Sequence, residues 1–287
     1  MRDHSEANIT QAVLKAFSRT ADPRLKTMMS ALVTHLHAFA RDVQLTPEEW
    51  WMAVEFLRSV GKICTDDRNE FILMSDIFGL SMLVDGLANR FPPGATPSTI
   101  IGPFYSDKSK RLPMGARIGR PEDGVPCVVS GLVRSTDGSP IEGAILDVWQ
   151  TDEDGMYDIV DPNQPIGNLR GTFETGTDGH YKFIGVKPKG YEVPVDGPGG
   201  RILEACSISE VRPAHIHFMI KAKGHLDCGT HVFVEGDPAI DSDPVFGTKN
   251  ELIVPFRKIS DPREAEREGI DGEFWRCDFD FVMTPVR

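Results

Sequence analysis

The pattern of apolar and polar positions along the 287 residues changes character near residue 105. Before that point, apolar residues recur at the spacing of one face of an α-helix. After it, short runs of β-branched and aromatic residues alternate with turn residues, which is typical of strands. The pattern predicts an α+β protein, with a helical domain over residues 1–105 and an all-β sandwich over residues 106–287.

Helical stretches are expected at three places in the first half. One starts with Asp22 as N-cap and Pro23 at the first helical position, and an apolar stripe follows it. Another starts at residues 46–49, whose Thr-x-x-Glu spacing forms a capping box. The last covers roughly residues 67–89 and is interrupted at Gly79, because glycine weakens a helical pattern.

The second half shows strand candidates separated by turn signals and no comparable helical pattern. Tight turns at residues 136–139 and 177–180 indicate hairpins. The strand candidates are residues 127–134, 144–149, 181–184, 202–207, 215–221, 230–234, 252–256 and 275–281. Short strands with regular turns between them favour a β-sandwich.

Candidate metal ligands lie within this second half. His215 and His217 stand two residues apart in strand-forming sequence, so their imidazoles point to one face and can bind one metal ion. Tyr157 follows a strand and an acidic turn that contains Gly155, and Tyr191 lies in a loop stiffened by prolines. Each residue also has an ordinary interpretation: the histidines as satisfied core side chains, Tyr157 as a strand-end aromatic, and Tyr191 as a loop anchor.

In chain order, Tyr157, Tyr191 and the pair formed by His215 and His217 resemble the ligand set of the intradiol ring-cleaving dioxygenases. The resemblance covers nearly the whole chain, since these enzymes have an N-terminal helical domain followed by a β-sandwich that holds iron. It implies that the four residues bind Fe(3+) and that Tyr191 leaves the metal when substrate binds. It also implies a catalytic role for Arg212, whose charge steadies an anionic intermediate; the alternative is a structural ion pair.

The charges of this ligand set favour ferric iron. Two phenolates and two neutral imidazoles leave Fe(3+) with a net charge of roughly +1, and hard anionic oxygen donors stabilise the ferric state. Because a free phenol has a pKa near ~10, the metal must keep both tyrosines deprotonated. The ion also lowers the pKa of an aromatic diol, whose proton a displaced tyrosinate accepts. Zinc is the poorer candidate, because its sites prefer Cys, His and carboxylate ligands.

The resemblance also implies a substrate pocket. Its expected residues are Met82, Asp85, Ile101, Gly102, Pro103, Phe104, Val193, Pro194, Arg212 and His231. Enzymes of the catechol type usually carry glutamine where this chain has His231, which favours the hydroxyquinol type. Asp85 would accept a hydrogen bond from a third ring hydroxyl, which catechol lacks. The ordinary alternatives are a solvated Asp85, an exposed strand residue at His231 and a linker turn at residues 102–103.

These inferences together imply a non-haem Fe(3+) intradiol dioxygenase that cleaves hydroxyquinol (1,2,4-trihydroxybenzene) between adjacent hydroxylated carbons with O2. The expected product is 3-hydroxy-cis,cis-muconate, which tautomerises to maleylacetate. A catechol or chlorocatechol 1,2-dioxygenase is the alternative within the same class. An alternative of another class is a non-catalytic sandwich module of the transthyretin-like or carbohydrate-binding kind, in which the histidine pair is structural.

The composition of the chain argues against several classes of binding partner. A net charge of −12 and a pI near 5.1 argue against binding to nucleic acid or acidic membranes. Without an apolar run of ~20 residues or a signal-peptide pattern, we expect a cytoplasmic protein and not a membrane protein. The five cysteines at irregular spacing indicate reduced thiols. The resemblance implies a homodimer joined through the helical domains, with lipid bound between them.

Overall fold

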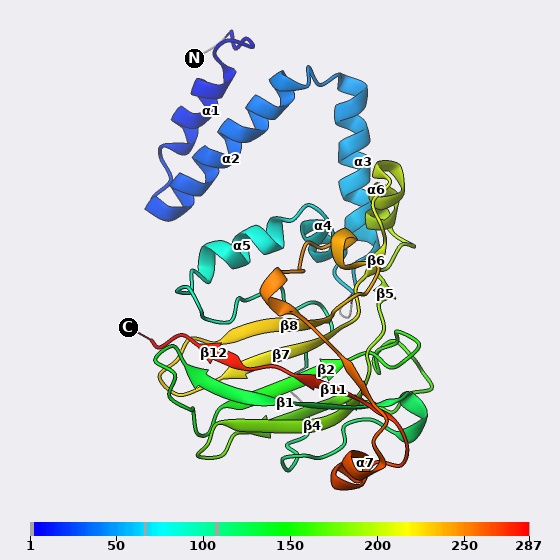
Figure 1. Ribbon diagram of the computed structural model, residues 1–287. Helices are drawn as coiled ribbons and strands as arrows, with labels where there is room; N and C mark the ends of the chain where they lie inside the picture. Colours follow the sequence, from blue (N-terminus) through cyan, green and yellow to red (C-terminus); the bar gives the residue numbers. More distant parts are fainter. Residues whose placement is uncertain (1–2, 66–67, 107–108, 287) are drawn as a thin grey trace. The chain divides into compact units, whose positions relative to one another are not determined.

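The computed structural model in Figure 1 describes residues 3–65, 68–106 and 109–286. By internal contacts, the chain divides into two compact units, residues 1–62 and 63–287. The helices over residues 70–88, which the sequence pattern assigns to the helical domain, belong to the second unit. The division at residues 105/106 therefore stays a proposal about domain organisation, and the contact boundary lies earlier in the chain.

The first unit is helical over its described residues. Its helices are α1 (Ile9–Phe17), α2 (Pro23–Asp42) and α3 (Pro47–Ile63). The Asp22 carboxylate caps α2 by accepting hydrogen bonds from two backbone N–H groups, at 2.7 and 3.1 Å. Thr46 and Glu49 cap α3 reciprocally, at 2.9 and 3.2 Å. Both predicted helix starts are confirmed, whereas α1 is a helix that the sequence pattern does not predict.

A bent pair of helices begins the second unit: α4 (Glu70–Ile77) and α5 (Leu80–Ala88). Asn69 caps α4 by accepting hydrogen bonds from two backbone N–H groups. Gly79 adopts φ 67° at the predicted interruption, and the helix axis turns by 80° there. The predicted start at Asp67 lies outside the described residues. Among the helices described, no single one is long and apolar enough to cross a membrane, although this bent pair passes that test by length and composition.

Two five-stranded sheets make up the sandwich over the described residues (Figure 1). One sheet contains β10 (Arg257–Ile259), β11 (Phe274–Asp278), β1 (Pro126–Ser135) and β12 (Phe281–Met283), with β4 (His180–Val186) also paired to β1. The other has the order β3 (Arg170–Glu174), β2 (Ile145–Gln150), β7 (His215–Lys221), β8 (Cys228–Val234) and β9 (Ile253–Val254). A two-stranded ribbon pairs β5 (Tyr191–Glu192) with β6 (Val211–Arg212). The predicted sandwich is confirmed.

The main hydrophobic core lies between the two sheets. Ile216 and Phe218 of β7 belong to it, together with side chains of the facing sheet such as Phe183. Burying an aromatic or aliphatic side chain of this kind contributes about 1.5–3 kcal/mol, so β7 is held firmly in place. Because successive side chains of a strand point to opposite faces, His215 and His217 lie on the outer face of the same sheet.

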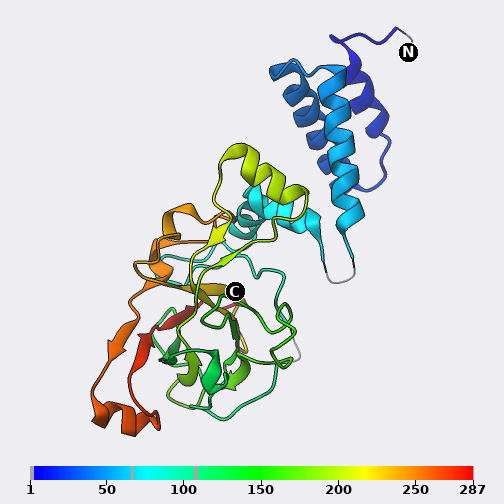
Figure 2. The ribbon, with the colours of Figure 1, turned by 90° about the vertical axis from the view of Figure 1, so that its right-hand side faces the viewer.

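One expected strand is a helix. Residues 202–207 fall mostly within α6 (Pro198–Cys206). Pro198 occupies the first helical turn, and Gly200 packs against the backbone of Val195, so the Pro-Gly run begins a helix instead of a loop. Figure 2 shows α6 beside α4, which it contacts. The sequence pattern also does not predict α7 (Pro262–Glu268). Short 3-10 helices occur at η1 (Pro121–Asp123), η2 (Ile240–Ser242) and η3 (Asn250–Leu252).

Candidate metal centre and active site

The outer face of β7 carries imidazoles whose positions are set by the sheet. His217 pairs in register with Trp149 of β2 on one side and with His231 of β8 on the other. The Trp149 ring stacks on the His217 imidazole, with centroids 4.6 Å apart and planes 12° apart. This stacking restricts rotation of the His217 ring, so its nitrogen atoms keep their direction.

The nitrogen atoms of the two β7 histidines converge. The carbonyl oxygen of Pro213 lies 2.6 Å from His215 Nδ1 and accepts a hydrogen bond from its proton. The Nε2 lone pair of His215 therefore faces the site. It lies 3.0 Å from His217 Nε2. With the His217 proton on Nδ1, two nitrogen lone pairs point at one another, an arrangement that a bound cation stabilises.

A buried phenol joins this group of donors. Tyr157 Oη lies 3.0 Å from His217 Nε2. The Asp152 carboxylate fixes the preceding turn by accepting hydrogen bonds from two backbone N–H groups within it. Gly155 lies in the left-handed region at φ 83°, where an added Cβ would approach the Gly190 carbonyl oxygen to 2.8 Å. The acidic turn thus aims the phenol, as the sequence predicts.

Burial sets the protonation of these donors. It raises the pKa of Tyr157 well above its usual range, and the neighbouring Tyr191 raises it further. Burial has the opposite effect on the histidines: it lowers the pKa of His217 well below its usual range and the pKa of His215 to about 3. The imidazoles are therefore neutral donors at ordinary pH, whereas the phenol becomes an anionic donor only when a cation compensates its charge. This mixture of nitrogen and oxygen donors fits a bound metal ion.

The β5–β6 ribbon brings Tyr191 and Arg212 together. The two residues form a register pair, and Arg212 Nη1 donates to Tyr191 Oη across 3.4 Å. The Tyr191 ring centroid lies 5.3 Å from that of Tyr157 and 5.7 Å from that of His215. Arg212 is buried and forms an ion pair with Asp243 at 3.1 Å. The sequence pattern predicts only a stiff loop at Tyr191. The structure adds that the β5–β6 ribbon places Arg212 where it orients the Tyr191 hydroxyl group.

A third imidazole lies beside the two of β7. His215, His217 and His231 each place one nitrogen atom within 4.8 Å of the others, and all three side chains are buried. His231 Nδ1 contacts the Thr99 hydroxyl group, whereas His231 Nε2 has no hydrogen-bond partner among the described residues. A buried polar atom without a partner is unusual, and it fits a site that a bound group completes.

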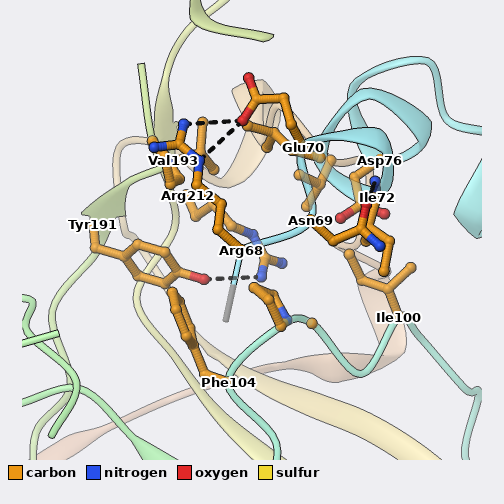
Figure 3. A pocket seen from close by; sticks show the side chains of 15 residues that line it. Arg68, Asn69, Glu70, Ile72, Asp76, Ile100, Phe104, Tyr191, Val193 and Arg212 are labelled. Atoms are coloured by element: carbon orange, nitrogen blue, oxygen red, sulfur yellow. Dashed lines mark hydrogen bonds and ion pairs between the residues drawn. The ribbon is translucent and has the colours of Figure 1, made fainter. Parts of the chain in front are cut away.

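A cavity of about 150 Å³ adjoins Tyr191 and Arg212 (Figure 3). A cavity of about this volume accommodates a benzene ring. Its lining includes Gly102, Pro103, Phe104, Tyr191, Val193, Pro194 and Arg212, all of them expected from the sequence. Met82, Asp85, Ile101 and His231 are not among the lining residues. The lining residues that the sequence reasoning misses are Arg68, Asn69, Glu70, Ile72, Leu73, Asp76, Ile100 and Val245.

Comparison with known proteins identifies the family. Residues 100–285 match the family described as Dioxygenase, and residues 22–96 match the one described as Catechol dioxygenase N terminus. Hydroxyquinol 1,2-dioxygenase from a Rhizobium strain is 42% identical over 281 residues, which cover 97% of this chain and 95% of that protein. The chain belongs to the intradiol ring-cleaving dioxygenases.

Two further relatives extend this finding. The crystal structure of hydroxyquinol 1,2-dioxygenase from Pseudomonas putida is 40% identical, covers 98% of this chain and 99% of that chain, and superposes with a TM-score of 0.91. Catechol 1,2-dioxygenase from Candida albicans is 38% identical over 280 residues, 96% of this chain and 91% of that protein. The chain is therefore a ring-cleaving enzyme whose family implies a metal cofactor. The alternative of a non-catalytic sandwich module does not hold.

In this dioxygenase, the aspartate that lines the cavity is Asp76 of α4 and not Asp85 of α5. Asp85 accepts hydrogen bonds from Asn89 at 2.8 Å and from Ser98 at 2.7 Å. The helix axis bends by 80° between α4 and α5, so the two helices present different faces, and the face of α5 that carries Asp85 does not line the cavity, contrary to what the resemblance implies. Asp76 is 6% exposed, and burial raises its pKa.

The other expected pocket residues outside the lining also have structural partners. Met82 packs against a small hydrophobic cluster that contains Leu203, and Ile101 lies against Gly229 of β8. His231 faces His217 across the sheet instead of the cavity. These residues surround the site without lining the space in which a ring fits.

The sequence does contain a signal for Asp76. Glu70, Leu73 and Ile77 recur at helical spacing and mark the buried face of α4, and Asp76 is buried beside them. A charged side chain on the buried face of a capped helix is rare without a function or a partner. Ile100 gives no such signal, because it lies in a segment without helix or strand periodicity.

The buried imidazole of His231 should make stability depend on pH. Burial, and then electrostatic interaction with His215 and Arg212, holds the pKa of His231 well below its usual range. Below a pH of about 6.5 the unfolded chain binds a proton at His231 that the folded chain does not, so the free energy of unfolding falls as pH falls. Replacing His231 by glutamine removes this loss, which is on the order of 2 kcal/mol at about pH 5.

Urea denaturation of the metal-free wild type and of the His231→Gln variant, at about pH 7.5 and about pH 5, measures the effect. We expect the wild type to lose more unfolding free energy than the variant between these pH values. Equal losses in the two proteins would show that His231 titrates normally in the folded state.

Proposed function

We propose that this chain is a non-haem Fe(3+) intradiol dioxygenase that acts on hydroxyquinol (1,2,4-trihydroxybenzene). The reaction breaks the bond between adjacent hydroxylated carbons and incorporates both atoms of O2. Its product is 3-hydroxy-cis,cis-muconate, which tautomerises to maleylacetate. One observation carries the substrate assignment: a buried carboxylate, Asp76, lines a ring-sized cavity beside Tyr191 and Arg212. Similarity to hydroxyquinol 1,2-dioxygenases over nearly the whole chain supports it.

The residues that would hold the ferric ion are Tyr157, Tyr191, His215 and His217. Support comes from the 3.0 Å approaches between the two Nε2 atoms and between His217 Nε2 and Tyr157 Oη, with the Tyr191 ring beside them. Two phenolate oxygens suit Fe(3+) better than zinc. When bound, the ion provides a positive centre that favours the deprotonated diol and withdraws electron density from its ring.

The protein's own groups would bind the ring and accept a proton. Ile100, Phe104 and Val193 line the cavity with apolar surface, which holds a flat ring and excludes water. Tyr191 Oη would be the base that accepts a proton from the substrate. Arg212 Nη1, 3.4 Å from that oxygen, keeps a fixed positive charge beside the anion that develops on the ring.

Asp76 would select for the third hydroxyl group. A hydroxyl that donates to this carboxylate fills an acceptor position beyond the hydrogen bond that Asp76 makes with Ser81, whereas catechol leaves that position unfilled. An unpaired buried polar group costs about 1–3 kcal/mol, and more when it is charged. Discrimination between hydroxyquinol and catechol therefore has a physical source within the cavity.

Substitution of Asp76 tests this role. We expect Asp76→Leu to lower kcat/KM for hydroxyquinol by at least about tenfold, or roughly 1.4 kcal/mol, while turnover of catechol holds or rises. Steady-state oxygen consumption with each substrate measures both values. Asp85→Asn is the matched comparison, because Asp85 is bonded to Ser98 and Asn89 and does not line the cavity. An equal loss on both substrates in Asp76→Leu, or a shift of preference in Asp85→Asn alone, would contradict the assignment.

Catechol or chlorocatechol is the alternative substrate. The 38% identity to the catechol 1,2-dioxygenase from Candida albicans supports this alternative. The deciding experiment compares kcat/KM for hydroxyquinol, catechol and 4-chlorocatechol on purified, iron-loaded enzyme. We expect hydroxyquinol to be preferred. If the wild-type enzyme is faster on catechol, the substrate assignment would change to catechol. The assignment of intradiol cleavage would still stand.

We also propose that the enzyme is a cytoplasmic homodimer that pairs through its first unit and binds lipid there. Apolar side chains of α2 that are 46–56% exposed support the pairing: Leu25, Met28, Leu32, Leu36 and Phe39. Contiguous apolar surface of this kind marks an interaction site. Five free cysteines suit a reducing compartment. Light scattering tests the dimer, and mass spectrometry of a solvent extract tests for lipid.

A further inference from the structure

The buried ion pair between Arg212 and Asp243 lies directly behind the cavity. Asp243 follows η2 and is 7% exposed. Its carboxylate accepts hydrogen bonds from Arg212 Nε at 3.1 Å and from Arg212 Nη2 at 3.4 Å. The third nitrogen of the guanidinium group, Nη1, is the one that donates to Tyr191 Oη. Two edges of one planar group are therefore directed at two different partners.

The same carboxylate is anchored by its own loop. It accepts hydrogen bonds from the backbone N–H groups of Val245 at 3.4 Å and Gly247 at 3.0 Å, and from the Thr248 hydroxyl group at 3.3 Å. The loop thus fixes both carboxylate oxygens before any contribution from Arg212. A carboxylate held in this way can fix the plane of a guanidinium group that binds it in a bidentate arrangement.

Gly247 lies directly against the ion pair. A Cβ atom at Gly247 would lie 3.0 Å from Arg212 Nη2 and 3.2 Å from Asp243 Oδ2. Contacts this short require the guanidinium group to shift by a few tenths of an ångström. The packing at Gly247 and the loop that anchors Asp243 both define where Arg212 Nη1 points.

We propose that Asp243 is a positioning residue that fixes the Arg212 guanidinium group, so that Nη1 faces Tyr191 and the cavity. The inference rests on the proposed function, which gives Arg212 its catalytic charge. In a purely structural ion pair, the geometry at Tyr191 would not depend on Asp243. In a positioning role, loss of the carboxylate lets the guanidinium rotate and changes the surroundings of the Tyr191 oxygen.

The first test is the Asp243→Asn variant, which removes the charge and keeps the shape. We expect iron content equal to that of the wild type, because no proposed ligand changes. The tyrosinate-to-iron absorption band should shift before any substrate is added, and kcat should fall by at least about tenfold while KM changes less. The matched control is Asp123→Asn, which removes a buried carboxylate that binds Arg120 and does not line the cavity. This control should keep the band and kcat.

The second test displaces Arg212 without removing a charge. Gly247→Ala adds the Cβ that meets Arg212 Nη2, and Gly247 does not need the left-handed region of the backbone. We expect the same two effects, a shifted band and a lower kcat at normal iron content. Gly86→Ala in α5 is the control, because an added Cβ there has nothing within 4 Å. If Asp243→Asn does not fold, the Gly247→Ala variant still tests the positioning role of Asp243.

The outcomes separate this inference from the proposed function. A wild-type band and kcat in Gly247→Ala and in folded Asp243→Asn, with only a lower Tm, would overturn the positioning role and leave the dioxygenase assignment standing. Failure of the proposed function appears instead in the wild-type protein, which would then show neither the absorption band nor ring cleavage.

Discussion

Replacing His215 by alanine should abolish ring cleavage and remove most of the bound iron. His215 Nε2 is held toward the site by the hydrogen bond between its Nδ1 proton and Pro213, and it lies 3.0 Å from His217 Nε2. Losing one of the four proposed ligands leaves an open position in the coordination sphere and so weakens binding of the ion. Metal analysis of the purified variant and oxygen consumption with hydroxyquinol measure the two losses.

The control for this substitution is His180→Ala, which removes a histidine at the start of β4, in the sheet that does not carry the site. It should keep wild-type iron content and activity. The fold of His215→Ala should survive, since the core between the sheets does not include this side chain. Full iron occupancy with an unchanged visible spectrum in His215→Ala would remove His215 from the ligand set.

Replacing Tyr191 by phenylalanine should separate metal binding from proton transfer. The variant keeps Tyr157, His215 and His217, so we expect it to retain part of its iron. Its kcat should fall by at least about a hundredfold, because general-base catalysis contributes on the order of 10²–10⁴ in rate. Its charge-transfer band should differ from that of the wild type before substrate is added, since one of two phenolates is gone. Rapid-mixing absorption measurements report the band and the turnover together.

Tyr181→Phe is the matched control, because it also removes one phenol oxygen, at a buried position outside the proposed site. Tyr181 donates to the carbonyl oxygen of Phe279 at 2.7 Å, in the core between the sheets. Losing that bond should cost about 1 kcal/mol of stability and leave the spectrum unchanged. Wild-type turnover in Tyr191→Phe would show that this tyrosine is not the base.

The alternation of side chains along a strand and the turn signals in the sequence predict the local geometry of His215, His217 and Tyr157. The spacing of His215 and His217 determines that both imidazoles share a face, because a strand alternates its side chains. The acidic turn before Tyr157 is equally local, since Asp152 and Gly155 fix it with neighbouring backbone groups. Interactions that depend on a few adjacent residues can be read from sequence.

The rest depends on how distant segments meet, which one sequence does not define. The sequence predicts the interruption at Gly79, but not that Asp85 of α5 binds Ser98 while Asp76 of α4 lines the cavity. Asp243 reaches Arg212 from a loop 31 residues further along the chain, and no periodic pattern marks it. Residues 202–207 show that a run with strand-like composition follows the helix start at Pro198 when tertiary packing favours it.

We propose that this chain cleaves hydroxyquinol and incorporates both atoms of O2 into the product. Turnover of hydroxyquinol by the iron-loaded enzyme under heavy-isotope O2, followed by mass spectrometry of the product, tests it most directly. We expect an open-chain hydroxymuconate or maleylacetate that carries two labelled oxygen atoms. A product without label, with one labelled atom, or with an intact ring would contradict it.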